Sequence, residues 1–267
     1  SLPRAVLHNF GVEDNLAIFI SSEIPPGTGL GSSSSVTVAL CKAISAASGR
    51  PLSKEELARL ACEIEIGKLG KPIGVQDQYA SAYGGLNWMT FGPDGVTVEP
   101  VRLATQTLMR LESKLLLMFT GESHDSSEIL ARQRSSSAEQ DPGVIEALKA
   151  TQVLAKTGLA CLQTGDLDRF GALLDEAWQH KRQFAPGVTN ARIDHCYAVA
   201  RNNGALGGKI AGAGGGGFLL LYCEDSTAPR VEAALHAEGL RRMDFRFEQD
   251  GARVLFNAGL RLNRADR

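Results

Sequence analysis

The chain of 267 residues contains 43% hydrophobic and 22% charged residues, the balance of a soluble globular protein with a sizeable core. Its formal net charge of −2 gives no basic field for nucleic acid or an anionic membrane, and no apolar run is long enough to span a bilayer. The five cysteines are far apart and never form a CxxC pair, so they favour neither a zinc site nor a disulfide framework. We therefore expect reduced thiols in a cytoplasmic protein without a nucleic-acid or membrane partner, and a homodimer is left open.

The N-terminal part is predicted to contain a strand, two helices and a hairpin. β-Branched and aromatic residues predict a strand over residues 15–24, which two prolines end. A glycine-rich loop follows, and then an apolar run predicts a helix over residues 33–48. Ser53 and Glu56 have the spacing of a capping box at the start of the next helix. "LNWMTF" and "VTVEPV" flank a Pro-Asp-Gly turn and predict a hairpin.

From about residue 105 the order of elements changes, which predicts a second domain. A buried strand over residues 114–120 is followed by a polar segment, residues 132–143, that is expected to be a loop. The remaining pattern predicts three helices, a strand, a helix and two strands, so the second half reads β-ααα-β-α-β-β. These elements are expected at residues 144–162, from Asp166 past Trp178, and at 191–203, 218–222, 231–238, 243–248 and 253–257.

The loop "PPGTGLGSSSS" at residues 25–35 leads directly into the predicted helix. A helix N-terminus offers unpaired N–H groups and the positive end of a dipole, and glycines let the backbone approach a phosphate closely. A phosphate cradle and a plain loop with a serine N-cap both fit this pattern. A Walker A loop is excluded because it needs a lysine, and a GxGxxG fingerprint fails because Ser34 stands at the last glycine position.

Two acidic residues beyond this loop are candidates for phosphoryl-transfer chemistry, which needs charge neutralisation and a group that orients or deprotonates the acceptor hydroxyl. Asp77 lies among apolar and small residues, and Glu65 lies beside the apolar stripe of the second helix. The alternatives are a solvated glutamate and an aspartate that caps a turn.

Two motifs resemble those of the GHMP kinases. "PPGTGLGSSSS" is similar to their phosphate-binding motif, and "KIAGAGGGGF" at residues 209–218 is similar to their third motif. "GVQDQYASAYGGLNWMTF", "LLLMFTG" and "NARID" resemble D-glycero-D-manno-heptose 7-phosphate kinases in particular. The resemblance covers the chain from about Leu16 to Phe256. The family's first motif and first N-terminal strands have no counterpart before Leu16.

The resemblance implies an α+β fold of two domains. The N-terminal domain, residues 1–105, would resemble domain 2 of ribosomal protein S5, and the C-terminal domain, residues 106–267, would be ferredoxin-like. It also implies a sugar kinase that uses ATP and Mg²⁺ to phosphorylate the anomeric hydroxyl of a heptose 7-phosphate.

The roles of individual residues follow from the same resemblance. Asp77 would act as the base toward the sugar hydroxyl, and Ser33 and Glu65 would hold Mg²⁺. The residues expected to bind ATP are Pro26, Gly27, Gly29, Leu30, Gly31, Ser32, Ser33, Ser34, Ser35, Lys209, Gly212, Ala213, Gly214, Gly215 and Gly216.

Two other functions stay open. One is another GHMP sugar kinase, with fucokinase-like or galactokinase-like specificity. The other is a non-catalytic sugar- or nucleotide-binding relative, since the first motif has no counterpart. His124 stands near a position where family members often carry arginine, and it fits a phosphate contact or a surface loop. Lys181 and Arg182 fit either the usual cations at a helix end or contacts to the sugar phosphate.

Overall fold

The computed structural model describes residues 1–12, 16–122, 126–259 and 262. The chain forms two compact units. Unit 1 consists of Ser1–Pro26, Gly31–Asn87 and Glu248–Arg267, and unit 2 consists of Gly27–Leu30 and Trp88–Phe247. The junction near residue 105 stays a prediction. Within the described ranges, every helix is too short or too polar to cross a lipid bilayer.

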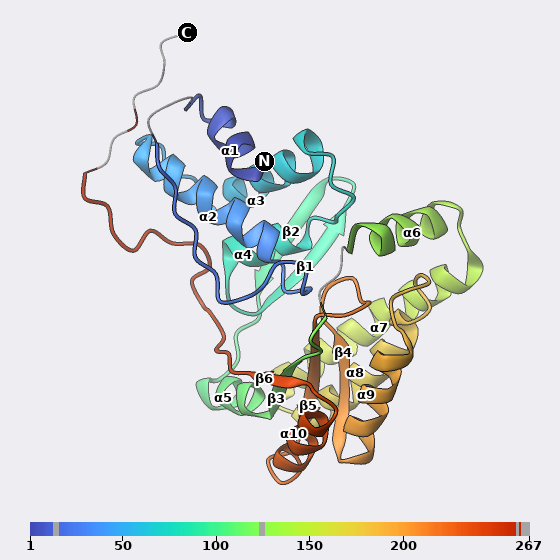
Figure 1. The fold of residues 1–267 in the computed structure, drawn as a ribbon. Helices are drawn as coiled ribbons and strands as arrows, with labels where there is room; N and C mark the ends of the chain where they lie inside the picture. Colours follow the sequence, from blue (N-terminus) through green and yellow to red (C-terminus); the bar gives the residue numbers. More distant parts are fainter. Residues whose placement is uncertain (13–15, 123–125, 260–261, 263–267) are drawn as a thin grey trace. The chain divides into compact units, whose positions relative to one another are not determined.

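Unit 1 is built from helices (Figure 1). They are α1 (Leu2–Asn9), α2 (Ser32–Ala47), α3 (Lys54–Cys62), a π-helical turn η1 (Glu63–Lys68) and α4 (Gln76–Tyr83). The helices α2, α3 and α4 pack against one another, and a buried apolar stripe on each forms the core of this unit. The predicted capping box is confirmed, because the Ser53 side chain accepts from the Glu56 N–H and the Glu56 side chain accepts from the Ser53 N–H.

The C-terminal segment of unit 1 packs against the end of α4. Gly85 N donates to Glu248 O at 2.6 Å, and Ala252 N donates to Ser81 O at 3.0 Å. A Cβ on Gly84 would lie 2.1 Å from Gly251 N, so only glycine fits at this crossing.

Two strand predictions in unit 1 are wrong. Residues 16–24 and 253–257 have strand-like sequences but form no strand in the structure. Phe19 is 95% exposed and Phe256 is 85% exposed, so neither segment buries its apolar residues. A strand needs the backbone of a neighbour, and no described strand pairs with either segment.

A hairpin stands at the start of unit 2. Its strands are β1 (Asn87–Gly92), whose first residue belongs to unit 1, and β2 (Gly95–Pro100), as predicted. The rest of unit 2 is a four-stranded sheet with helices. The strands are β3 (Leu115–Phe119), β4 (Ala205–Ile210), β5 (Phe218–Cys223) and β6 (Arg241–Met243), and the helices are α5 (Thr105–Lys114), α6 (Ser126–Ala138), α7 (Pro142–Thr164), α8 (Leu167–Lys181), α9 (Ala191–Asn202) and α10 (Ala228–Ala237).

The sheet of unit 2 is antiparallel, in the order β4-β5-β3-β6. Its apolar core joins β3, β4 and β5 to α8, α9 and α10. Helix α8 passes over β4 at very close range, because a Cβ on Gly207 would lie 2.1 Å from Gly171 O. This arrangement of helices and an antiparallel sheet agrees with the predicted α+β fold.

Several element predictions for unit 2 need correction. The segment 132–143 is largely helical, because α6 extends to Ala138 and α7 begins at Pro142. Its polar composition suggested a loop, but Arg, Gln, Ala and Glu are good helix formers on a solvated surface. Asp141 caps α7 by accepting from Gly143 N and Val144 N. The strand expected at 243–248 is instead the short β6, and α5 and β4 were not predicted.

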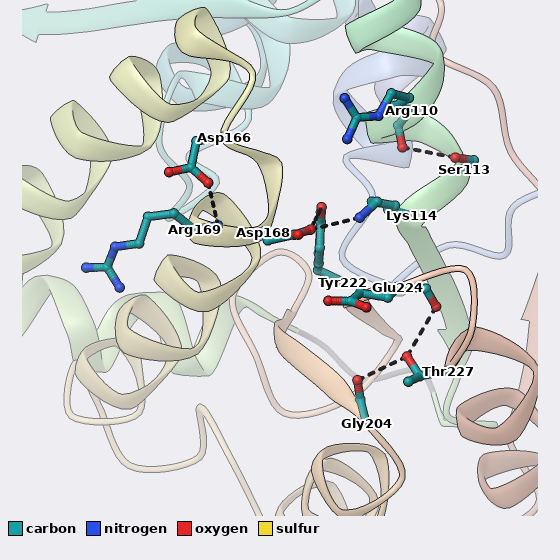
Figure 2. Close-up of polar contacts among 10 residues, drawn as sticks. All are labelled: Arg110, Ser113, Lys114, Asp166, Asp168, Arg169, Gly204, Tyr222, Glu224 and Thr227. Atoms are coloured by element: carbon teal, nitrogen blue, oxygen red, sulfur yellow. Dashed lines mark hydrogen bonds and ion pairs between the residues drawn. The ribbon is translucent and has the colours of Figure 1, made fainter.

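Polar contacts also tie α8 to its neighbours away from the glycine-rich loops (Figure 2). The Asp168 carboxylate accepts from Lys114 Nζ at 2.8 Å and from the Tyr222 hydroxyl at 3.0 Å. The hydrogen bonds from Lys114 and Tyr222 lower the pKa of Asp168. Since Asp168 is largely exposed, we interpret this cluster as a structural tie between α5, α8 and β5.

Candidate active site

The N-terminus of α2 is open to a ligand. Gly31 is the N-cap residue and has φ +66°, a left-handed conformation that suits glycine. Within the described part of the chain, the N–H groups of Ser32, Ser33 and Ser34 have no protein acceptor. Unpaired amides at a helix N-terminus favour an anion, so this turn can bind a phosphate.

Asp77 lies beside this turn. A Cβ on Gly31 would lie 3.2 Å from Asp77 Cγ and 3.3 Å from Asp77 Oδ2. The carboxylate accepts no hydrogen bond from any residue that the structure describes, so it does not cap α4. Although the residue as a whole is exposed, partial desolvation of its carboxyl and the negative charge of Glu65 raise the pKa of Asp77. A free carboxylate with a raised pKa is suited to accept a proton.

Glu65 lies on the π-helical turn η1 and is fully buried. The turn is marked by the bond from Leu69 N to Ile64 O, five residues apart. Turns of this kind occur frequently at functional sites. Here the turn directs a carboxylate into the interior of unit 1.

The Glu65 carboxylate has a partner on each oxygen. Oε1 accepts from Ser33 Oγ at 2.6 Å and from Lys71 Nζ at 2.7 Å, and Oε2 accepts from Gln78 Nε2 at 2.8 Å. Burial alone would raise the pKa of Glu65, but the hydrogen bonds, led by that from Lys71, outweigh it and lower the pKa. Glu65 is therefore held ionised next to the start of α2.

Ser33 and Glu65 together offer a place for a cation. Both contribute oxygen atoms, which are the donors that Mg²⁺ prefers. An ammonium group already lies against both, since Lys71 Nζ is 2.5 Å from Ser33 Oγ. No cluster of three His, Cys, Asp or Glu side chains suited to a metal is found in the described ranges. A cation bound here would therefore complete its coordination with oxygens of a ligand or water.

Sequence reasoning missed the role of Lys71, which had no distinguishing signal. Its spacing from Glu65 matches no helical contact, because the chain leaves η1 before it. The bond from Lys71 N to Glu65 O at 3.0 Å turns the chain back toward the carboxylate.

In unit 2 the two glycine-rich segments contact each other through their backbones. A Cβ on Gly29, which has φ +80°, would lie 2.5 Å from Ala211 O, and one on Gly217 would lie 2.2 Å from Thr28 O. The structure thus brings together two loops that lie about 180 residues apart in the sequence. Of the residues predicted to bind ATP, unit 2 contains Gly27, Gly29, Leu30, Lys209, Gly212, Ala213, Gly214, Gly215 and Gly216, and unit 1 contains Pro26, Gly31, Ser32, Ser33, Ser34 and Ser35.

The amides of the second loop divide into two groups. Gly215 N donates to Val188 O and Gly217 N donates to Glu122 O, both at 2.9 Å, so these two hold the loop in place. In the described structure no protein acceptor is found for the amides of Gly212, Ala213, Gly214 and Gly216.

Two lysines supply positive charge next to this loop. Lys181 Nζ donates to Ile210 O at 3.1 Å and to Gly212 O at 2.5 Å. Desolvation and the charge of Lys209 lower the pKa of Lys181 to about 7, and desolvation also lowers that of Lys209. The Lys209 side chain forms no hydrogen bond or ion pair with the residues that are described. Arg182 pairs instead with Asp194 at 2.9 Å, and His124 lies outside the described residues.

Gly29→Ala should destabilise unit 2 by about 2–4 kcal/mol. The alanine would have to adopt the left-handed backbone conformation of Gly29, which is unfavourable for a residue with a Cβ, and that Cβ would clash with Ala211 O. Gly165→Ala is the matched control, since Gly165 also has a left-handed φ of +76° but open space around its Cβ position. This control should lose only about 1 kcal/mol. Urea unfolding followed by Trp fluorescence measures both variants; equal losses would show that the contact between the two loops contributes nothing.

Comparison with known proteins identifies the family. Residues 2–85 match the model of the GHMP kinases N terminal domain, and residues 159–241 match that of the GHMP kinases C terminal domain. The D-glycero-alpha-D-manno-heptose 7-phosphate kinase of Campylobacter jejuni subsp. jejuni is 32% identical over 233 residues, 87% of this chain and 68% of that protein. The chain belongs to the GHMP kinase family. It is therefore a phosphotransferase of the class that uses an alcohol group as acceptor, and the family uses ATP as donor.

Other GHMP kinases show the breadth of the family. The crystal structure of a D-glycero-D-manno-heptose 1-phosphate kinase from Bacteriodes thetaiotaomicron superimposes with a TM-score of 0.74 at 30% identity, over 94% of this chain and 72% of that one. The mevalonate kinase of Pyrococcus furiosus is 30% identical over 258 residues, 95% of this chain and 72% of that protein. These matches confirm the predicted GHMP kinase fold, whereas the acceptor differs among the relatives.

Proposed function

We propose that the protein transfers the γ-phosphate of ATP to the anomeric hydroxyl of a heptose 7-phosphate. One geometric observation carries the chemistry: the unpaired Asp77 carboxylate lies against Gly31, at the turn where the amides of α2 have no protein acceptor. A base is thus held beside a place suited to a transferred phosphate. The acceptor is inferred from the relative that is 32% identical and is named as a heptose 7-phosphate kinase.

Each proposed site residue has a distinct task. Residues 26–35 bind the phosphates of ATP through main-chain amides and serine hydroxyls. Lys209 and the free amides of the second glycine-rich loop are proposed to contact phosphate oxygens of ATP. Asp77 accepts the proton of the sugar hydroxyl as that oxygen attacks phosphorus and the bond to ADP breaks.

Ser33 and Glu65 are proposed to hold Mg²⁺. The ion, when bound, would neutralise negative charge on the phosphates of ATP. The residues fit this role because two oxygens, one from a fully buried ionised carboxylate, converge at 2.6 Å on the first turn of α2. Gln78 orients the carboxylate by donating to its other oxygen.

A kinase assay on the full chain tests this function. ATP, Mg²⁺ and, in separate reactions, D-glycero-D-manno-heptose 7-phosphate, fucose and galactose are supplied, and release of ADP is followed. The heptose phosphate should be preferred in kcat/KM by at least about tenfold, and ³¹P NMR should show a new anomeric phosphate. Preference for fucose or galactose would instead indicate another sugar kinase. Failure to transfer phosphate to any of the three would support a non-catalytic relative.

A further inference from the structure

Lys71 occupies the position between Ser33 and Glu65. Its Nζ atom lies 2.7 Å from Glu65 Oε1 and 2.5 Å from Ser33 Oγ, and these two oxygens are themselves 2.6 Å apart. The three polar atoms thus form a compact triangle. The carboxylate side of the triangle is fully buried, whereas the Lys71 side chain is 31% exposed.

Without a bound metal, the positive charge of Lys71 is needed to balance the buried Glu65 carboxylate. A buried carboxylate without a positive partner is strongly unfavourable. Among the described residues, Lys71 is the only cation that pairs with Glu65, and Gln78 contributes a neutral amide donor. The Gln78 amide oxygen is buried without a partner in the described structure.

The backbone of Lys71 is fixed more firmly than its ammonium group. Lys71 N donates to Glu65 O at 3.0 Å, which anchors the start of the side chain. The stem has four carbons and reaches the surface, so the ammonium can move into water without unfolding the loop. A divalent cation that binds Ser33 Oγ and Glu65 Oε1 needs the space that the ammonium holds.

We propose that the Lys71 ammonium group is a built-in counter-ion that occupies the cation position between Ser33 and Glu65 when no metal is bound. A divalent cation that binds there displaces it. This inference rests on one part of the proposed function, namely that Ser33 and Glu65 bind Mg²⁺. Lys71 is then a positioning residue: it keeps Ser33 and Glu65 together before the metal arrives, and it competes with the metal for them. It takes part in no covalent step.

Replacement of Lys71 with Met tests the proposal with Mn²⁺ alone as the probe, in the full chain without sugar or nucleotide. Free Mn²⁺ is measured by electron paramagnetic resonance, and Mg²⁺ is used to displace it. Removal of the competing positive charge should tighten Mn²⁺ binding by about tenfold. The metal-free variant should also unfold at lower urea than the wild type, and Mg²⁺ should restore the midpoint.

Lys68→Met is the matched control. It removes the same charge three residues earlier, from a lysine that pairs with exposed Glu63 at 3.4 Å. Its Mn²⁺ affinity should equal that of the wild type. If the Met variant at 71 does not fold, Lys71→Arg replaces it: arginine keeps the charge and can hold the carboxylate with two N–H groups, so Mn²⁺ should bind no more tightly than to the wild type.

Three results would overturn the proposal: unchanged or weaker Mn²⁺ binding in Lys71→Met, tighter binding in Lys71→Arg, or no Mn²⁺ binding to the wild type and the Met variant alike. Because no sugar is present, the result does not depend on the kinase assay. A protein that phosphorylates none of the sugars but shows the tighter binding would contradict the proposed function and support the counter-ion.

Discussion

Asp77→Asn should lower kcat by about 10²- to 10⁴-fold, the usual contribution of a general base. Asparagine has nearly the same shape but cannot accept the proton of the sugar hydroxyl. The wild-type carboxylate accepts no hydrogen bond from the described residues, so the substitution breaks no structural contact. Affinity for ATP should therefore stay the same. Single-turnover phosphate transfer and calorimetric titration with ATP measure the two effects separately.

Asp94→Asn is the control for the loss of one negative charge. Asp94 is exposed in the turn between β1 and β2, and its change should leave kcat unaltered. If Asp77→Asn keeps wild-type turnover, the assignment of the base is wrong. If ATP affinity falls while kcat at saturating ATP is unchanged, Asp77 acts in binding and not in proton transfer.

Structural elements that depend only on their own residues could be predicted from local signals in the sequence. The capping box at Ser53 and Glu56 satisfies backbone groups of the same turn, so it could be read without knowledge of any neighbour. The glycines before α2 were also readable, because a left-handed turn into a helix demands them. Asp77 and Glu65 were found from residue type, setting and family resemblance, and the structure places both near the start of α2.

Predictions failed where a structural element depends on distant partners. Residues 16–24 and 253–257 have strand propensity, but propensity alone does not supply a neighbouring strand. The polar segment 132–143 became helical because its residues tolerate a solvated helix. The contact of Lys71 with Ser33 joins positions 38 residues apart and depends on a π-helical turn, which no periodicity in the sequence reveals.

Glu65→Gln should be the most destabilising conservative substitution in unit 1. It removes the carboxylate charge and leaves the Lys71 ammonium without its partner. Breaking a buried ion pair costs about 3–5 kcal/mol, but Lys71 is partly exposed and can be hydrated, so about 2–3 kcal/mol is expected at pH 7. Urea unfolding followed by far-UV circular dichroism measures the loss, and the Mg²⁺ concentration needed for half-maximal activity should rise by about tenfold or more.

The dependence of this loss on pH separates charge from packing. Because the folded state lowers the pKa of Glu65 from 4.5, its contribution is fully present above that value and disappears as the pH falls through the lower folded-state pKa. The difference in the free energy of unfolding between the wild type and Glu65→Gln should therefore be constant from pH 7 to pH 6 and shrink below about pH 4.5. Glu63→Gln changes the same charge on the same turn, but Glu63 is exposed, so its loss should stay within about 0.5 kcal/mol. If the loss in the free energy of unfolding for Glu65→Gln does not shrink in acid, the shape of the side chain matters at this position, and not its charge.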